Sequence, residues 1–169
     1  MDEGLLLARA VFGLVMAAHG SQKLFGWFGG YGLDGTGGFL EGLGFRPGRL
    51  FALVAGASEF AGGLLLALGL FGPVGSALIL AVMIVAAITV HWQGGLFSTS
   101  NGIEVPLLYA TAVTALALTG PGRYSLDALL GLTSLWTPAL VWSALAIGIV
   151  GGVANLALRR APAGKAVGV

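Results

Sequence analysis

The sequence contains no cysteine and few charged residues, and both shortages limit what the protein can do. Without cysteine the chain forms no disulfide, carries no thiol redox centre, and attaches neither an iron–sulfur cluster nor a c-type haem through its own sulfur atoms. A redox role would need a cofactor or partner from outside this chain. Of the 169 residues, 9% are charged and 57% hydrophobic, whereas soluble domains average about 25% charged residues. We therefore expect an integral membrane protein.

The few charges also have no dominant sign, since eight Lys and Arg residues and seven Asp and Glu residues leave a net charge of +1. No basic patch indicates a nucleic-acid partner, so we expect none. The alternation of apolar and polar residues that barrel strands need is missing too. The apolar runs approach the roughly 20 residues that a membrane-spanning helix needs. We expect five such helices, over residues 4–25, 50–70, 73–92, 103–119 and 138–158.

Two connecting segments are expected to hold short helices at the membrane surface. Residues 26–50 are rich in glycine but also contain Trp27, Phe28 and Tyr31, which favour an interfacial element over a free linker. We predict a short amphipathic helix over residues 36–44, with Thr36 as its candidate N-cap. A second short helix is predicted over residues 128–136.

Five helices place the two termini on opposite sides of the membrane. The beginning, MDEGLLLARA, lacks the positively charged segment of a signal peptide, so we expect residues 4–25 to be a mature first helix. Arg123 is the only basic residue in the loops of one side, and the other side carries Arg46, Arg49, Arg159, Arg160 and Lys165. The positive-inside rule then predicts a cytoplasmic C-terminus.

The first helix carries three ionisable residues where lipid would surround a lone helix. Arg9, His19 and Lys23 fall on one helical face, which is roughly 120° wide. An ionisable side chain at membrane depth costs at least about 2.5 to 3.5 kcal/mol unless it is paired or hydrated. This face should therefore point into the bundle.

Glu59, in the middle of the second helix, is the natural partner for this face. At 1.5 Å per residue, Lys23 lies only about 3 Å below the membrane face and is expected to extend to it. This leaves Arg9 and His19 as partners of Glu59, and Arg9 is favoured because its guanidinium holds a carboxylate with two hydrogen bonds. Such a pair could also do no more than fix helix register. His19 is the better candidate for proton transfer or for hydrogen bonding to a ligand carbonyl.

Three further residues, His91, Trp92 and Glu104, are expected at the same membrane side as Lys23. They are candidates for lining a ligand pocket there, although His91 and Trp92 also suit an interfacial aromatic belt. Asn101 and Glu104 have the spacing of a helix capping box, which gives Glu104 a structural alternative. The spacing of histidines and carboxylates matches no local metal-ligand motif, so no metal site is expected.

Several blocks of the sequence resemble the DoxX family of small bacterial and archaeal membrane proteins. They are Arg9 in the first helix, HGSQKLFG at residues 19–26, the loop ending in FLEGLGF, GGLLLALGL after Glu59, the helix that opens with Glu104, and GPGRYSLD. The resemblance implies an all-α integral membrane protein in the cytoplasmic membrane. Its four-helix bundle would occupy residues 1–131 and include the short interfacial helix. An additional transmembrane helix (132–158) and a flexible polar tail (159–169) would follow.

The resemblance also implies a redox setting, because relatives include the membrane subunit of a thiosulfate:quinone oxidoreductase. The recurrent polar residues of the family correspond here to Arg9, His19, Lys23, Glu59 and Glu104. The leading hypothesis is a quinone-interacting subunit that depends on a redox partner subunit. His19 would hydrogen-bond or protonate a quinone oxygen, Glu59 would relay the proton, and Arg9 would set the charge of Glu59.

Two alternatives from other functional classes remain open at this point. In the first, the buried charges line the substrate or proton path of a small transporter. In the second, they serve helix packing in a structural or assembly subunit, and the small residues on the helix faces permit a homo-oligomer.

Overall fold

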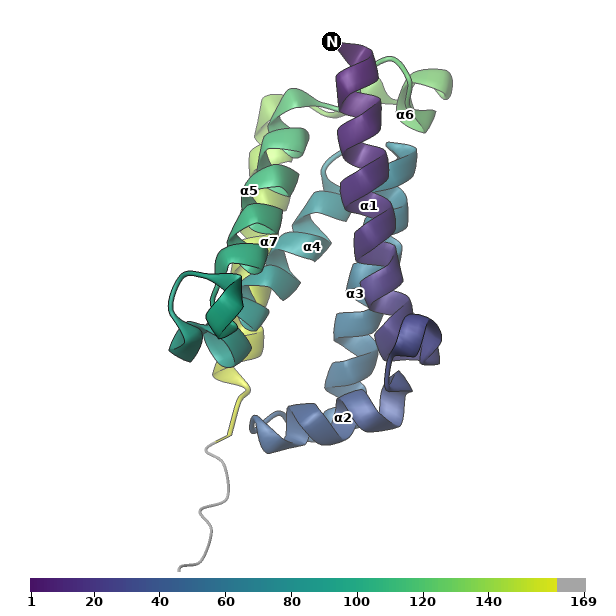
Figure 1. The fold of residues 1–169 in the computed structure, drawn as a ribbon. Helices are drawn as coiled ribbons and strands as arrows, with labels where there is room; N and C mark the ends of the chain where they lie inside the picture. Colours follow the sequence, from purple (N-terminus) through teal and green to yellow (C-terminus); the bar gives the residue numbers. More distant parts are fainter. Residues whose placement is uncertain (161–169) are drawn as a thin grey trace, which may run out of the picture.

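The computed structural model describes residues 1–160, which form a bundle of α-helices (Figure 1). The α-helices are α1 (Asp2–Phe25), α2 (Gly32–Gly42), α3 (Gly48–Leu68), α4 (Val74–Ala86), α5 (Glu104–Thr119), α6 (Leu126–Leu129) and α7 (Pro138–Ala157). A π-helical turn at Ala87–His91 continues α4, and short 3₁₀ turns lie at Trp27–Gly29, Trp92–Gly94, Ser98–Ser100 and Thr133–Leu135. Residues 1–160 contain no strand. The all-α fold class is confirmed.

Long apolar helices make the chain a multi-pass membrane protein. Within residues 1–160, four of them have the length and hydropathy to cross a membrane: α1, α3, α4 with its continuation to Gly94, and α7. α5 is also apolar but has only 16 residues, or about 24 Å at 1.5 Å per residue. It lies beside α4 and α7 in the bundle, so the fifth expected span is a shorter helix within it (Figure 1).

The closest helix pair is α1 with α3, and glycine makes this approach possible. A Cβ placed on Gly63 of α3 would lie 2.5 Å from Gly13 O and from Ala17 N of α1. A Cβ on Gly20 would overlap the backbone of α3 at Phe60. Small residues at such positions let two helix backbones pack directly against each other in a membrane. The polar face of α1 is thereby held against α3.

The two short helices differ from their predicted bounds. α2 begins at Gly32, so Thr36 lies inside it and does not cap it, and the helix extends across the end of the bundle (Figure 1). The chain enters α2 through a tight turn in which Gly26 and Phe28 have φ of 73° and 51°. The second predicted helix, 128–136, is wrong: α6 ends at Leu129 and a separate 3₁₀ turn follows, because Gly131 takes φ of 70°.

The start of α1 and the end of α7 lie at opposite ends of the bundle, as five spans require (Figure 1). After α7, Arg159 Nε donates to Leu43 O at 2.6 Å and Arg160 N donates to Gly44 O at 2.9 Å. These contacts hold the first two residues of the predicted tail beside the end of α2. The remainder of that tail, residues 161–169, lies outside the described residues.

Candidate functional site

Polar side chains within the bundle form two separate groups, one in each half, around the buried Glu59 and around the buried Arg9. The first group surrounds a cavity of about 360 Å³ among α1, α3, the end of α4 and the start of α5, which we call the Glu59 cavity. Its polar or titratable lining residues are His19, Lys23, Glu59, His91, Ser98, Asn101 and Tyr109, and its apolar side chains are Met16, Met83, Ala86, Val105 and Pro106. The second group, described below, is centred on Arg9.

Lys23 is the partner of Glu59. Lys23 Nζ lies 2.5 Å from Glu59 Oε2, with the Glu59 side chain 4% exposed and the Lys23 side chain 29% exposed. Two expectations are therefore wrong: Arg9 does not pair with Glu59, and Lys23 does not extend to the membrane face. Helical side chains lean toward the N-terminus of their helix. Both side chains therefore point along α1 toward its N-terminus. This brings the Lys23 ammonium closer to Glu59 and takes the Arg9 guanidinium farther from it.

Two histidines from different helices line the Glu59 cavity. His19 comes from α1, one turn before Lys23, and His91 comes from the π-helical turn that ends α4. His91 Nδ1 lies 3.1 Å from Asn101 O. Because a carbonyl only accepts, Nδ1–H is the donor, and Nε2 of the neutral ring is left as an acceptor. π-Helical turns are rare and frequently occur at functional sites.

Trp92 and Glu104, the other two predicted pocket residues, do not line the cavity. Trp92 is 62% exposed. Glu104 Oε2 accepts a hydrogen bond from Ser98 N at 2.8 Å and so fixes the loop that precedes α5. The capping box is not formed, because α5 begins at Glu104 with Ile103 as its N-cap and Asn101 has φ of 60°.

Several cavity residues were not predicted as site residues from the sequence, among them Met16, Met83 and Tyr109. The two methionines are buried, at 1% and 7% exposed. Met16 shares the helical face of His19 and Lys23, whereas Met83 is indistinguishable in the sequence from other apolar residues of α4. Tyr109 did have a usable signal, since it is the only aromatic residue in α5. Its ring packs edge-to-face on Phe12 of α1, with centroids 5.4 Å apart, an arrangement that stabilises aromatic pairs.

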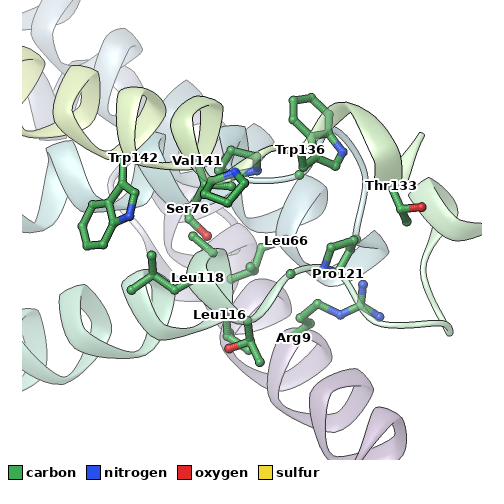
Figure 2. A pocket seen from close by; sticks show the side chains of 17 residues that line it. Arg9, Leu66, Ser76, Leu116, Leu118, Pro121, Thr133, Trp136, Val141 and Trp142 are labelled. Atoms are coloured by element: carbon green, nitrogen blue, oxygen red, sulfur yellow. The ribbon is translucent and has the colours of Figure 1, made fainter.

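Arg9 lies in the other half of the bundle, at a second pocket of about 330 Å³ (Figure 2). We call this the Arg9 pocket; α1, α4, α5 and α7 contribute to its walls. The Arg9 side chain is 2% exposed, and its Nη2 donates to Tyr124 O at 2.5 Å. Its Nε and Nη1 have no hydrogen-bond partner among residues 1–160.

Asp127, next to this pocket, is a buried polar residue that the sequence analysis missed. It is 0% exposed and accepts from Phe71 N at 2.9 Å, Gly72 N at 2.6 Å and Trp136 Nε1 at 2.7 Å. The carboxylate thereby ties the α3–α4 turn to the segment between α6 and α7. Buried carboxylates are tolerated when several donors satisfy them. Its position in the GPGRYSLD block was the available signal.

Comparison with known proteins places the chain in a family. The DoxX family model matches residues 4–92, just over half of the 169 residues. The match covers α1 to the end of the π-helical turn, and so includes Arg9, His19, Lys23, Glu59 and His91. No curated protein matches the chain, and no solved structure matches it. The chain belongs to the DoxX family.

Proposed function

We propose that this chain is a membrane subunit of a redox complex and binds the ring of a quinone in the Glu59 cavity. The observation that carries the proposal is the Lys23–Glu59 pair, which borders a cavity between membrane helices whose other walls are largely apolar. Buried ionisable residues in membrane helices are expensive and usually mark a functional path or site. Here the pair has space for a ligand beside it.

The size and walls of the Glu59 cavity suit a flat apolar ring. Its volume of about 360 Å³ falls within the roughly 300 to 1,000 Å³ of small-molecule sites. Met16 and Met83 offer polarisable thioethers, which contact aromatic faces favourably. Tyr109 and Pro106 provide further flat surfaces on the α5 side. A ring bound there would meet apolar groups on its faces and polar groups at its edge.

The polar groups of the cavity supply what quinone chemistry needs from a protein. Reduction of a quinone to a quinol consumes two electrons and two protons. Lys23 and a protonated His19 can each donate a hydrogen bond to a carbonyl oxygen, since both line the cavity one helical turn apart. Glu59 can accept and return a proton through its contact with Lys23 Nζ. The electrons would come from a redox partner subunit, because this chain has no cysteine to hold a cluster.

The test is a binding titration of the purified protein with menaquinone and ubiquinone analogues. We expect His19→Ala and Glu59→Gln each to weaken binding by about tenfold, the loss that follows from one hydrogen bond to a charged group. Asp34→Asn is the matched control, because this carboxylate is 86% exposed on α2 and outside the cavity. Absence of binding by both analogues, or equal binding by wild type and both cavity variants, would contradict the proposal.

A second candidate, a small carrier, is favoured by the arrangement of the two cavities. The Glu59 cavity and the Arg9 pocket lie in opposite halves of the bundle. Along α4 and α5, Ile79 and Val113 come between residues that line one cavity and residues that line the other, and both are 0% exposed. In a carrier, the helices would move so that the binding site opens alternately to each side of the membrane, across this apolar layer. Proteoliposomes with an internal pH dye and an imposed potential test this idea. Proton uptake without a redox partner, abolished in Glu59→Gln, would favour the carrier over the redox subunit.

A further inference from the structure

The Arg9 pocket points to a second ligand, in the half of the bundle away from the proposed quinone site. We propose that it binds the oxyanion head of an amphipathic molecule, with the head at the guanidinium of Arg9 and the apolar tail directed between α5 and α7. The inference does not rest on the quinone proposal, because the two sites share no lining residue.

The guanidinium of Arg9 is held in place with most of its hydrogen-bonding capacity unused. Arg9 is 2% exposed, and only Nη2 has a partner, the carbonyl of Tyr124. Nε and Nη1 have none among the described residues. Buried polar groups in native proteins are nearly always hydrogen-bonded, so an exception calls for an explanation. The N–H groups of Nε and Nη1 point to opposite sides of the guanidinium. A bidentate ligand oxyanion would therefore accept from the second N–H of Nη2 together with one of these two nitrogens, the fork geometry that arginine offers to carboxylate and phosphate.

The backbone around Arg9 is shaped to admit the guanidinium at this position. Gly69, at the end of α3, has φ of 63°, and a Cβ placed on it would overlap Arg9 Nη1. Glycine is therefore required twice at residue 69, by its backbone conformation and by the space that Arg9 occupies. Gly69 therefore lets the guanidinium of Arg9 lie directly against the end of α3.

Charge in the pocket favours an anionic head. Among the residues that the structure describes, Arg9 is the only ionisable one that lines it. Asp127 is nearby, but its oxygens accept from two backbone N–H groups and from Trp136 Nε1, and it is not among the lining residues. Among residues 1–160 no carboxylate forms a salt bridge with Arg9, and a ligand could provide one.

The remaining walls are suited to an apolar tail. Leu66, Leu116 and Val141 are buried lining residues, whereas Leu118 of α5 and Trp142 of α7 are 48% and 60% exposed (Figure 2). The two exposed side chains lie on membrane helices, where lipid would surround them, so the pocket opens toward the bilayer. Its volume of about 330 Å³, about eleven times the share of one liquid water, accommodates a head group and part of a tail.

The test compares ligands that differ only in the head. Purified protein in phosphatidylcholine nanodiscs is titrated with radiolabelled decanoate and, separately, with decanol. We expect decanoate to bind at least tenfold tighter, and Arg9→Gln to abolish this preference. Arg123→Gln is the matched control, since Arg123 is an exposed arginine at the same end of the bundle and outside the pocket. The preference should survive this change.

A second arm identifies the source of the head and covers the case in which Arg9→Gln does not fold. Phosphatidylglycerol added to the phosphatidylcholine nanodiscs should compete with decanoate if the head group of a net anionic lipid can occupy the pocket, and should not compete if only a free acid can. Trp142→Ala should weaken decanoate binding, and Trp92→Ala, equally exposed at 62% but outside the pocket, should not. If neither decanoate nor phosphatidylglycerol binds in preference to its uncharged counterpart, or if both tryptophan variants bind decanoate like wild type, the proposal is wrong.

Discussion

Loss of Lys23 should destabilise the protein more than loss of the charge on Glu59, because the two partners differ in burial. Lys23→Met removes the ammonium and leaves a Glu59 carboxylate that is 4% exposed. Removing one partner of a fully buried pair costs about 3 to 5 kcal/mol. Since Lys23 is 29% exposed and borders a cavity, solvent screens part of the pair, and we expect about 2 to 3 kcal/mol.

Glu59→Gln should cost less, about 1 kcal/mol, for two reasons. The glutamine oxygen can still accept from Lys23, and the lysine chain is long enough to turn its ammonium toward the interface. The double variant Lys23→Met/Glu59→Gln should be more stable than Lys23→Met alone, because it removes the unpaired charge.

Unfolding free energies from SDS titration in mixed micelles, followed by circular dichroism, measure these differences. Arg49→Met is the control, since it removes one partner of the exposed Asp34–Arg49 pair, whose side chains are 86% and 73% exposed. It should change stability by less than about 1 kcal/mol. If Glu59→Gln proves more destabilising than Lys23→Met, or if the double variant is the least stable of the three, the burial argument is refuted.

Other predictions concern helix packing, the buried carboxylate and membrane topology. Gly63→Ala would place a Cβ 2.5 Å from backbone atoms of α1 and should cost about 1 to 3 kcal/mol or more in unfolding free energy, whereas Gly151→Ala, with nothing within 4 Å, should stay within about 0.5 kcal/mol. Asp127→Asn replaces one acceptor oxygen with an NH₂ group, which would face an N–H donor. The substitution should lower the free energy of unfolding by about 1 to 3 kcal/mol, and with it the melting temperature. An unchanged melting temperature would contradict the role of Asp127 in holding the loops together. A fluorescent protein fused after residue 169 should fluoresce in cells, as a cytoplasmic C-terminus requires, and an active alkaline phosphatase fusion there would show the opposite orientation.

The helices could be predicted from the sequence because membrane spans depend on long apolar runs, which composition alone reveals. The predicted range 138–158 and the observed α7, Pro138–Ala157, differ by one residue. Prediction was weaker where a loop sets the boundary. α2 starts four residues before the predicted residue 36 because the entry turn depends on positive φ at Gly26 and Phe28, and such backbone conformations follow from packing more than from residue type.

The candidate site was predictable in its residue types but not in its pairings. The rise of 1.5 Å per residue gives the depth of each Cα atom below the membrane face, and these depths favour a pair between Arg9 and Glu59. The side chains of Arg9 and Lys23 extend several ångströms beyond their Cα atoms and lean toward the start of α1. This displacement is large enough to make Lys23, and not Arg9, the partner of Glu59. His91 depends in addition on a π-helical turn at Ala87–His91, for which periodicity gives no signal.

Because Glu59 is paired with Lys23 and not with Arg9, the proposed proton transfer involves a lysine in place of an arginine. An arginine beside Glu59 would hold that carboxylate in one charge state, since the guanidinium stays protonated. A lysine can lose its proton when buried and can also swing away on its flexible chain. The proposed proton transfer would therefore use Lys23 and Glu59, and His19, one turn before Lys23 on α1, lines the same cavity.

Photolabelling with an azido-naphthoquinone, mapped by mass spectrometry on the protein in nanodiscs, tests the central claim most directly. If the Glu59 cavity binds the quinone ring, the label should appear on Met16, Met83 or Tyr109, from three different helices. The labelling should compete with unlabelled menaquinone analogue and decrease in His19→Ala. Labelling confined to the Arg9 pocket, or spread over lipid-facing residues without competition, would contradict the account.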